Sequence, residues 1–143
     1  MASWSDFAAA APDLAERVKA SLDAHKHKTI ATLRKDGSPR ISGTEVEFAD
    51  GELWIGSMKD ALKAKDLLRD PRFALHNGYS DTSPEGLSDA KLAGLAHAVA
   101  HPDHHRFRLD IREASVVTVD EEQTHLVIDV WTADGGRKQI KRR

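Results

Sequence analysis

Cysteine is absent from this chain, which excludes disulfide bonds, a thiolate nucleophile and zinc sites with cysteine ligands. Aromatic residues make up only 6% of the sequence, and no apolar run approaches the roughly 20 residues that a membrane-spanning helix needs. The N-terminus does not follow the basic-then-apolar pattern of a signal peptide, because Asp6, Asp13 and Glu16 interrupt its apolar residues. These absences favour a soluble cytoplasmic protein without a membrane partner.

The chain also lacks a large excess of charge and the common phosphate-binding and nucleophile motifs. Its formal net charge is −2, which does not favour nucleic acid as a partner, although residues 137–143 form a basic tail. No Gly-x-Ser-x-Gly elbow, Walker-type loop or Gly-x-Gly-x-x-Gly motif occurs. If the protein binds a phosphate, it does so outside the usual nucleotide folds.

The N-terminal segment predicts a helix over about residues 5–24. Apolar residues recur there at spacings of three and four, which places them on one face of a helix. Ser5 is the expected N-cap, and Pro12 predicts a late start or a kink. The length of 143 residues fits a single domain, 1–143, in which a barrel over about residues 28–143 follows this helix.

From residue 28 onward the apolar period changes from helical spacing to two, which indicates strands. The Asp36–Gly37 and Asp50–Gly51 pairs predict tight hairpin turns. Residues 91–100 fit either a helix or a strand, and residues 78–89 read as an exposed loop. The expected strands cover residues 29–33, 40–48, 52–57, 72–77, 106–119 and 125–131. We therefore predict a mainly β protein with two or three helices and six or seven antiparallel strands closed into a barrel.

A lysine-rich helix is expected over about residues 59–69, where it ends before Pro71. Lys59, Lys63 and Lys65 lie in its first half, where the helix dipole disfavours cations and where like charges four residues apart repel. A solvated helix face explains this pattern equally well as a bound anion does. The second interpretation gains support from Gly56 and Ser57, which end the preceding strand and allow a ligand to approach the backbone.

Four histidines within nine residues raise the question of a metal site. Pro102 breaks any helix between them, and Asp103 is the one carboxylate in a plausible ligand position. We therefore expect no metal ion at His97, His101, His104 and His105. His76 is the single candidate for a proton-transfer residue, but an ordinary strand histidine is the better explanation, so the catalytic residues are unknown.

Several segments together resemble the flavin-binding split barrels related to pyridoxamine 5′-phosphate oxidase, in particular their small actinobacterial-type members. The resemblance covers most of residues 27–143. It includes an "ATL" first strand, a Gly-x-Pro hairpin exit, the "GELWIGS" strand, the lysine-bearing helix, "DLLRDPRFAL" and the ending "HLVIDVW…GGRKQIKR". It implies an FMN-binding split barrel that forms a homodimer with the cofactor at the subunit interface.

The resemblance also implies which residues hold the cofactor. Lys63 aligns with the family's phosphate-binding lysine, whereas Leu62 stands where the family has an arginine. Lys59 would supply the missing charge, and Arg40 loosely matches the arginine of the second strand. The remaining expected contacts to the flavin come from Ser42, Thr44, Trp54, Gly56 and Ser57.

The function implied is an oxidoreductase that transfers a hydride between FMN and a small conjugated substrate. An 8-hydroxy-5-deazaflavin coenzyme is the alternative cofactor, because surplus lysines suit its phosphodiester and acidic tail. The substrate-binding C-terminal motif of the oxidase is not evident, so the resemblance does not imply vitamin B6 oxidation. A flavin- or heme-binding carrier or sensor without turnover is the alternative function.

Overall fold

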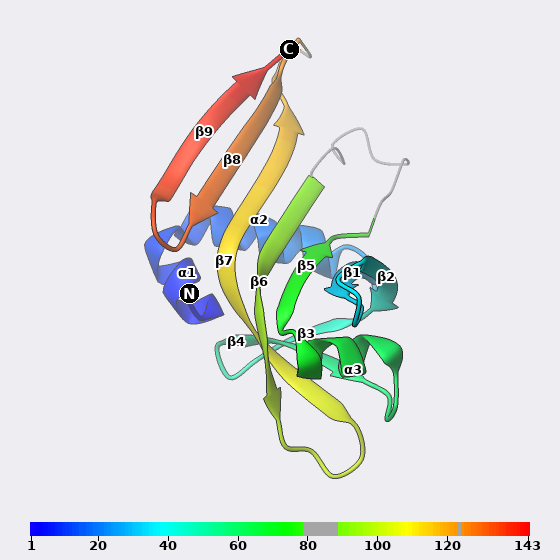
Figure 1. Ribbon diagram of the computed structural model, residues 1–143. Helices are drawn as coiled ribbons and strands as arrows, with labels where there is room; N and C mark the ends of the chain where they lie inside the picture. Colours follow the sequence, from blue (N-terminus) through cyan, green and yellow to red (C-terminus); the bar gives the residue numbers. More distant parts are fainter. Residues whose placement is uncertain (79–88, 123) are drawn as a thin grey trace.

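The computed structural model describes residues 1–78, 89–122 and 124–143. Figure 1 shows the three helices and nine strands of this described part. They are α1 (Trp4–Ala10), α2 (Pro12–Asp23), β1 (Lys28–Leu33), β2 (Pro39–Thr44), β3 (Val46–Ala49), β4 (Glu52–Ser57), α3 (Leu62–Arg69), β5 (Arg72–His76), β6 (Asp89–Val99), β7 (His105–Val119), β8 (Leu126–Thr132) and β9 (Gly136–Arg142). The loop predicted over 78–89 falls almost entirely outside the described residues.

The prediction of a mainly β, antiparallel fold is confirmed, but the described residues contain nine strands rather than six or seven. The strand expected over 40–48 is divided at Glu45 into β2 and β3. Residues 91–100 lie in β6 rather than in a helix, and the basic tail pairs with β8 as β9. Sequence periodicity identified the extended segments but did not reveal a one-residue break or the pairing of a polar tail.

The strands form a split barrel. Hydrogen bonding follows the order β2-β1-β5-β6-β7-β4-β3, and the two end strands of this path, β2 and β3, are joined by the single residue Glu45. β2 also contacts β4, so the sheet curls until its two ends meet. Asp50 and Gly51 both have positive φ angles, 54° and 74°, as expected for the tight turn predicted between β3 and β4.

β7 is the strand at which the barrel splits. Its first half pairs with β4, from Ser57 opposite His105 to Leu53 opposite Leu109. Its second half pairs with β8, from Glu113 opposite Thr132 to Val119 opposite Leu126. β8 and β9 therefore leave the barrel as an extended arm (Figure 1).

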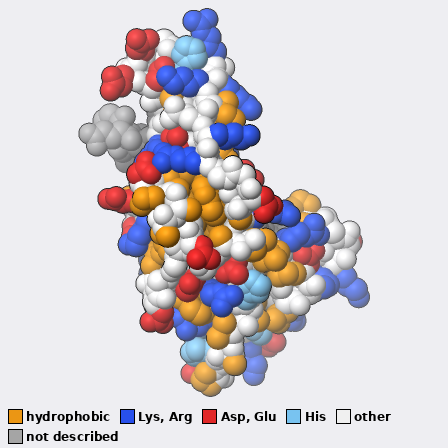
Figure 2. Space-filling model, turned by 90° about the vertical axis from the view of Figure 1, so that its left-hand side faces the viewer, with side chains coloured by type: hydrophobic (Ala, Val, Ile, Leu, Met, Phe, Trp, Pro, Cys, Tyr) orange, Lys and Arg blue, Asp and Glu red, His pale blue; other side chains and the backbone are white. Residues whose placement is uncertain are grey.

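The basic tail belongs to this arm and is not a separate cationic patch. Arg137 Nη1 contacts Asp13 of α2 at 2.6 Å, and its Nη2 lies 3.8 Å from Asp129 of β8. Figure 2 shows acidic side chains among the basic ones near the upper end of the molecule. Part of the positive charge of β9 is thus used in holding the arm against α2.

The predicted N-terminal helix is two helices, because the chain turns at Ala11 before Pro12, the first residue of α2. Ser3 is the N-cap of α1, where it forms a capping box with Asp6, so the prediction of Ser5 as the cap was wrong. Ser5 instead donates a hydrogen bond to the Gly51 carbonyl. None of the helices in the described residues is long and apolar enough to cross a membrane.

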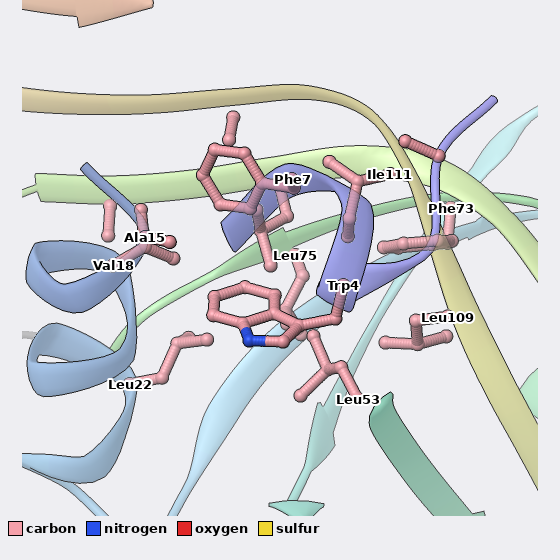
Figure 3. Packing of buried hydrophobic residues seen from close by; sticks show 14 of the residues in the cluster. Trp4, Phe7, Ala15, Val18, Leu22, Leu53, Phe73, Leu75, Leu109 and Ile111 are labelled. Atoms are coloured by element: carbon pink, nitrogen blue, oxygen red, sulfur yellow. The ribbon is translucent and has the colours of Figure 1, made fainter. Parts of the chain in front are cut away.

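The main core lies between the N-terminal helices and the sheet. Trp4 and Phe7 of α1 meet edge to face, with ring centroids 5.2 Å apart. They pack, together with the apolar face of α2, against barrel side chains (Figure 3). Trp131 joins this cluster, with its ring centroid 4.9 Å from that of Phe7. The two helices thus cover one side of the sheet and leave the end of β4 uncovered.

Candidate functional site

A cleft of about 600 Å³ opens where β4 ends and α3 begins; we call it the β4–α3 cleft. Its wall is made by the β2–β3 connection, by β4 and by side chains from three further segments. The lining residues are His27, Gly43, Thr44, Glu45, Val46, Glu47, Trp54, Gly56, Ser57, Met58, Lys63 and His104. This volume lies within the range of small-molecule binding sites, about 300–1,000 Å³.

The strand alternation of β4 decides which of its side chains reach the cleft. Leu53 and Ile55 are buried in the barrel, so Trp54 and Gly56 face outward. After Ser57 the chain makes a tight turn in which Asp60 has a φ angle of 66°, and α3 begins at Leu62. The helix predicted over 59–69 therefore starts three residues later than expected.

Lys63 reaches the cleft from the first turn of α3. Its Nζ donates a 2.9 Å hydrogen bond to the carbonyl oxygen of Gly43 on β2. Burial lowers the pKa of the Lys63 ammonium below its usual 10.5, and the carboxylate of Glu45 partly opposes this effect. The ammonium is therefore both positioned and partly desolvated, and both conditions strengthen its attraction for an anion.

Ser57 also lines the cleft, at the end of β4, and its hydroxyl is buried. Only 6% of the residue is exposed, and its Oγ has no hydrogen-bond partner among the described residues. An unsatisfied buried polar group costs about 1–3 kcal/mol. A ligand that paired with this hydroxyl would remove that cost.

Trp54 forms a fixed aromatic wall of the cleft. Its indole Nε1 donates a 2.9 Å hydrogen bond to the Ala49 carbonyl oxygen, and the Arg106 guanidinium lies 3.9 Å from the ring centroid on one side. The indole is only half-buried, so Trp54 faces the cleft rather than the core. A planar ligand would find a rigid apolar surface here.

Two carboxylates also line the cleft, which sequence reasoning did not foresee. Glu45 lies 3.7 Å from Lys26 Nζ and 3.9 Å from His27 Nδ1, so nearby basic groups partly balance it. Glu47 lies opposite Trp54 in the β3–β4 pairing. The cleft is therefore of mixed charge, with its most desolvated cation at Lys63.

Arg40 is bound to a buried acid and does not line the cleft. Its Nε donates to Asp66 Oδ2 at 2.8 Å, and Thr32 Oγ1 donates to the same oxygen at 2.7 Å. Arg69 Nη2 donates to the other oxygen of Asp66 at 2.9 Å. Arg40 thereby fastens α3, and with it Lys63, to the first hairpin of the barrel.

Five of the eight predicted cofactor-binding residues line the cleft, namely Thr44, Trp54, Gly56, Ser57 and Lys63. The other three, Arg40, Ser42 and Lys59, are outside its lining. Lys59 lies in the exposed turn before α3, and Ser42 lies two residues before Thr44 on β2. Their roles as ligands stay predictions, which the geometry supports less well than it supports the other five.

The histidines divide between two places. His76 is paired with Asp89 and lines a different groove, on the outer face of β1, β5 and β6, so it does not serve the cleft. His104 lies at the cleft, with its ring within 3.7 Å of the position that a Cβ on Gly56 would take. Its ring centroid is 3.7 Å from that of His101. Among the described residues, no three His, Asp or Glu side chains are arranged to hold a metal ion.

Comparisons with known proteins agree with this fold. The family model described as "Pyridoxamine 5'-phosphate oxidase" matches residues 14–130. No curated protein matches the chain. The structure resembles PhzG from Burkholderia lata 383, solved in complex with tetrahydrophenazine-1-carboxylic acid, with a TM-score of 0.72 and 12% identity over 92% of this chain and 91% of that one.

Two further solved structures are similar. A pyridoxamine 5'-phosphate oxidase-related, FMN binding protein from Nostoc punctiforme PCC 73102 gives a TM-score of 0.66 at 10% identity, over 92% of this chain and 94% of that one. HutZ, the heme storage protein of Vibrio cholerae, gives 0.55 at 15% identity, over 71% and 89%. At these identities the likeness shows a shared fold.

Proposed function

Because the chain belongs to the pyridoxamine 5′-phosphate oxidase family, we propose that it binds FMN in the β4–α3 cleft and transfers a hydride between this cofactor and a small conjugated substrate. One observation carries the proposal. Ser57, whose buried hydroxyl is unpaired, and Lys63, whose ammonium is partly desolvated, both line one cleft of about 600 Å³. Together they supply a hydrogen-bonding group and a positive charge for a phosphate.

The residues of the cleft suit the other parts of FMN as well. Trp54 offers an aromatic wall to a flat ring system, and Gly43 and Gly56 leave the backbone accessible because they carry no side chain. The likeness to an FMN binding protein from Nostoc punctiforme supports the same cofactor. Lys63 and Ser57 would hold the phosphate, while Trp54 and Thr44 would limit where the ring can lie.

The chain need supply little acid–base chemistry for this reaction. A bound flavin accepts or gives the hydride, and the protein's work is to bind, orient and shield it. Lys63 fixes the phosphate end, and the Asp66 network fixes Lys63. None of the cleft residues is assigned as a catalytic acid or base.

An 8-hydroxy-5-deazaflavin coenzyme is the alternative cofactor, and the charges of the cleft favour FMN over it. Glu45 and Glu47 would repel a long acidic tail, and the surplus cations Lys59 and Lys65 are outside the cleft lining. A single phosphate needs fewer cations, and Lys63 already meets that need. We therefore expect tighter binding of FMN.

Binding without turnover is the alternative function. HutZ, which has a similar structure, is described as a heme storage protein, so this fold also occurs in a protein whose described role is storage. Reduction of a quinone or nitroimidazole by the FMN-loaded protein, at rates well above those of free FMN, would support an oxidoreductase. Cofactor binding without any such reduction would favour the carrier.

The cofactor assignment is tested by titrating ligand-free protein separately with FMN and with the deazaflavin coenzyme. We expect saturable, one-to-one binding of FMN with a dissociation constant in the micromolar range or below, seen as a shift of the flavin absorption bands. Tighter binding of the deazaflavin would identify that coenzyme, and not FMN, as the cofactor. Failure of both ligands to bind would refute the proposal.

We also propose that the protein is a homodimer that covers the groove on the outer face of β1, β2, β5 and β6. This groove of about 310 Å³ is lined by Ile41, by the small side chains Ala31, Ala74 and Ala93, and by a few charged residues such as Lys91 and Glu113. Ile41 is 75% exposed and lies on the same strand as Gly43 and Thr44 of the cleft. A second copy seated here would bury Ile41 and border the cofactor site.

Ile41→Glu tests this interface, because a charge at its centre should separate the subunits. We expect sedimentation to show a dimer for the wild type and a monomer for this variant, with at least a tenfold weaker association. Leu68→Glu is the matched control, since Leu68 is 55% exposed on α3 and does not line the groove. A monomeric wild type, or equal behaviour of the two variants, would contradict the interface.

A further inference from the structure

Arg106 of β7 lies beside the wall of the cleft in an unusual arrangement. It is directly opposite Gly56 of β4, which has no side chain to meet it. Arg106 therefore extends diagonally over Trp54, where its guanidinium carbon is 3.9 Å from the ring centroid. Diagonal contacts of this kind are within reach of long side chains on paired strands.

The Arg106 guanidinium lies over the Trp54 ring, and this contact supplies no carbonyl or carboxylate acceptor for its N–H groups. The five N–H donors of arginine lie in the plane of the group, so contact with the indole does not satisfy them. The side chain of Arg106 forms no hydrogen bond or ion pair within the described part of the chain. A positioned cation with unused donors is thus fixed to the aromatic wall.

Arg108, two residues along β7, provides an internal comparison. Its Nε lies 3.3 Å from Asp110 Oδ1, and the other oxygen of Asp110 lies 2.9 Å from His97 Nε2. Arg108 already has a carboxylate partner from the protein. Arg106, on the same face of the same strand, has none.

We propose that Arg106 is the anchor for a carboxylate on the substrate, and hence that the substrates are planar, conjugated carboxylates. This inference rests on the proposed function, since it places the substrate in the cleft that would hold FMN. An aromatic acid could lie against the cleft wall while its carboxylate accepts two parallel hydrogen bonds from the guanidinium edge. Such paired hydrogen bonds to arginine are both strong and directional.

The phosphate of the cofactor would be bound by a different cation from the substrate carboxylate. Lys63 bonds to Gly43 on β2, whereas Arg106 lies on β7, on the other side of β4 from β3. Lys63 lines the cleft, whereas Arg106 lies outside its lining and reaches it only at the Trp54 ring, so the two cations would meet different parts of the bound molecules. Glu47, which faces Trp54 across the β3–β4 pair, would repel a carboxylate that was not held at Arg106.

The test compares 1-naphthoate with 1-naphthamide, which have similar shapes but differ in charge. Dissociation constants are measured by calorimetry for the wild type, Arg106→Gln and Arg108→Gln, each with and without FMN. We expect the wild type to bind the carboxylate about tenfold more tightly than the amide. Arg106→Gln should lose this preference, and Arg108→Gln should keep it.

Three results would overturn the inference: no preference for the carboxylate in the wild type, an unchanged preference in Arg106→Gln, or an equal loss in Arg108→Gln. FMN affinity should change less than twofold in Arg106→Gln. A larger loss would assign the guanidinium to the cofactor instead. If FMN fails to bind the wild type, the proposed function fails, while the measurements without FMN still decide whether Arg106 anchors a carboxylate.

Discussion

α3 carries two polar anchors one turn apart, Asp66 and Lys63, and they differ in how completely the protein satisfies them. Both oxygens of Asp66 accept hydrogen bonds, from Arg40, Thr32 and Arg69, and the residue is only 2% exposed. Lys63 donates to the Gly43 carbonyl at the edge of an open cleft whose buried Ser57 hydroxyl is unpaired. The chain itself supplies the hydrogen-bond partners of Asp66, whereas the cleft at Lys63 is open and contains a hydroxyl without a partner.

The difference separates a structural role from a binding role. A buried charge whose partners all come from the chain contributes to folding, because removing one partner leaves the others buried and unpaired. A partly desolvated cation and an unpaired hydroxyl, on residues that line one cleft, instead keep their capacity for a ligand. Substitutions at Asp66 should therefore affect stability first, and substitutions in the cleft should affect binding first.

The largest effect is expected for Asp66→Asn, which leaves Arg40 and Arg69 without their carboxylate. We expect a loss of about 3 kcal/mol in the free energy of unfolding at pH 7, measured in urea. Asp60→Asn is the matched control, because Asp60 is exposed and asparagine tolerates its positive φ angle. That variant should stay within about 0.5 kcal/mol of the wild type.

The wild type and Asp66→Asn can also be compared over a range of pH. Burial by itself raises the pKa of Asp66, but hydrogen bonds from Arg40 and Thr32 and the charges of Arg40 and Arg69 outweigh it, so the pKa lies below the usual 3.8. The stabilisation by Asp66 is therefore present above its unfolded pKa and is lost as the pH falls through the lower folded pKa. The gap between wild type and Asp66→Asn should narrow only below about pH 4. A gap that already closes at pH 6 would show that Asp66 is not held in its charged form.

Ser57→Ala should have a smaller effect, and the effect should be on ligand binding and not on stability. Removing an unpaired buried hydroxyl should leave the free energy of unfolding unchanged or raise it by up to about 1 kcal/mol. FMN affinity should fall about fivefold, because one hydrogen bond to the phosphate is lost. Equal FMN affinity in wild type and Ser57→Ala would remove Ser57 from the phosphate site.

Much of the fold could be predicted because its signals are local. Alternating apolar residues marked the strands, and Asp36–Gly37 and Asp50–Gly51 marked two hairpins that the structure contains. The break at Glu45 and the pairing of β9 were missed, since both depend on how the sheet closes and not on the residues beside them. The capping box at Ser3 was readable, with Asp6 three residues later, but Ser5 was preferred.

The site residues whose positions follow from the local backbone could be predicted from the sequence. Ser57 and Lys63 lie in the cleft because a strand ends and a helix begins between them. Arg40 was not assignable, because its choice between a phosphate and Asp66 depends on how α3 docks on the first hairpin. Arg106 was missed altogether: only the β4–β7 register places it opposite Gly56 and over Trp54.

The most direct test of the central claim is a comparison of FMN with riboflavin, which lacks the phosphate, on wild type, Lys63→Gln and Lys65→Gln. Lys65 is the matched control, since it is exposed on the same helix. We predict that Lys63→Gln weakens FMN binding at least tenfold, the loss of about 1.4 kcal/mol, and changes riboflavin binding less than twofold. Lys65→Gln should bind both ligands as the wild type does. Equal FMN affinity in the two lysine variants, or an equal loss for riboflavin in Lys63→Gln, would contradict a phosphate held at Lys63.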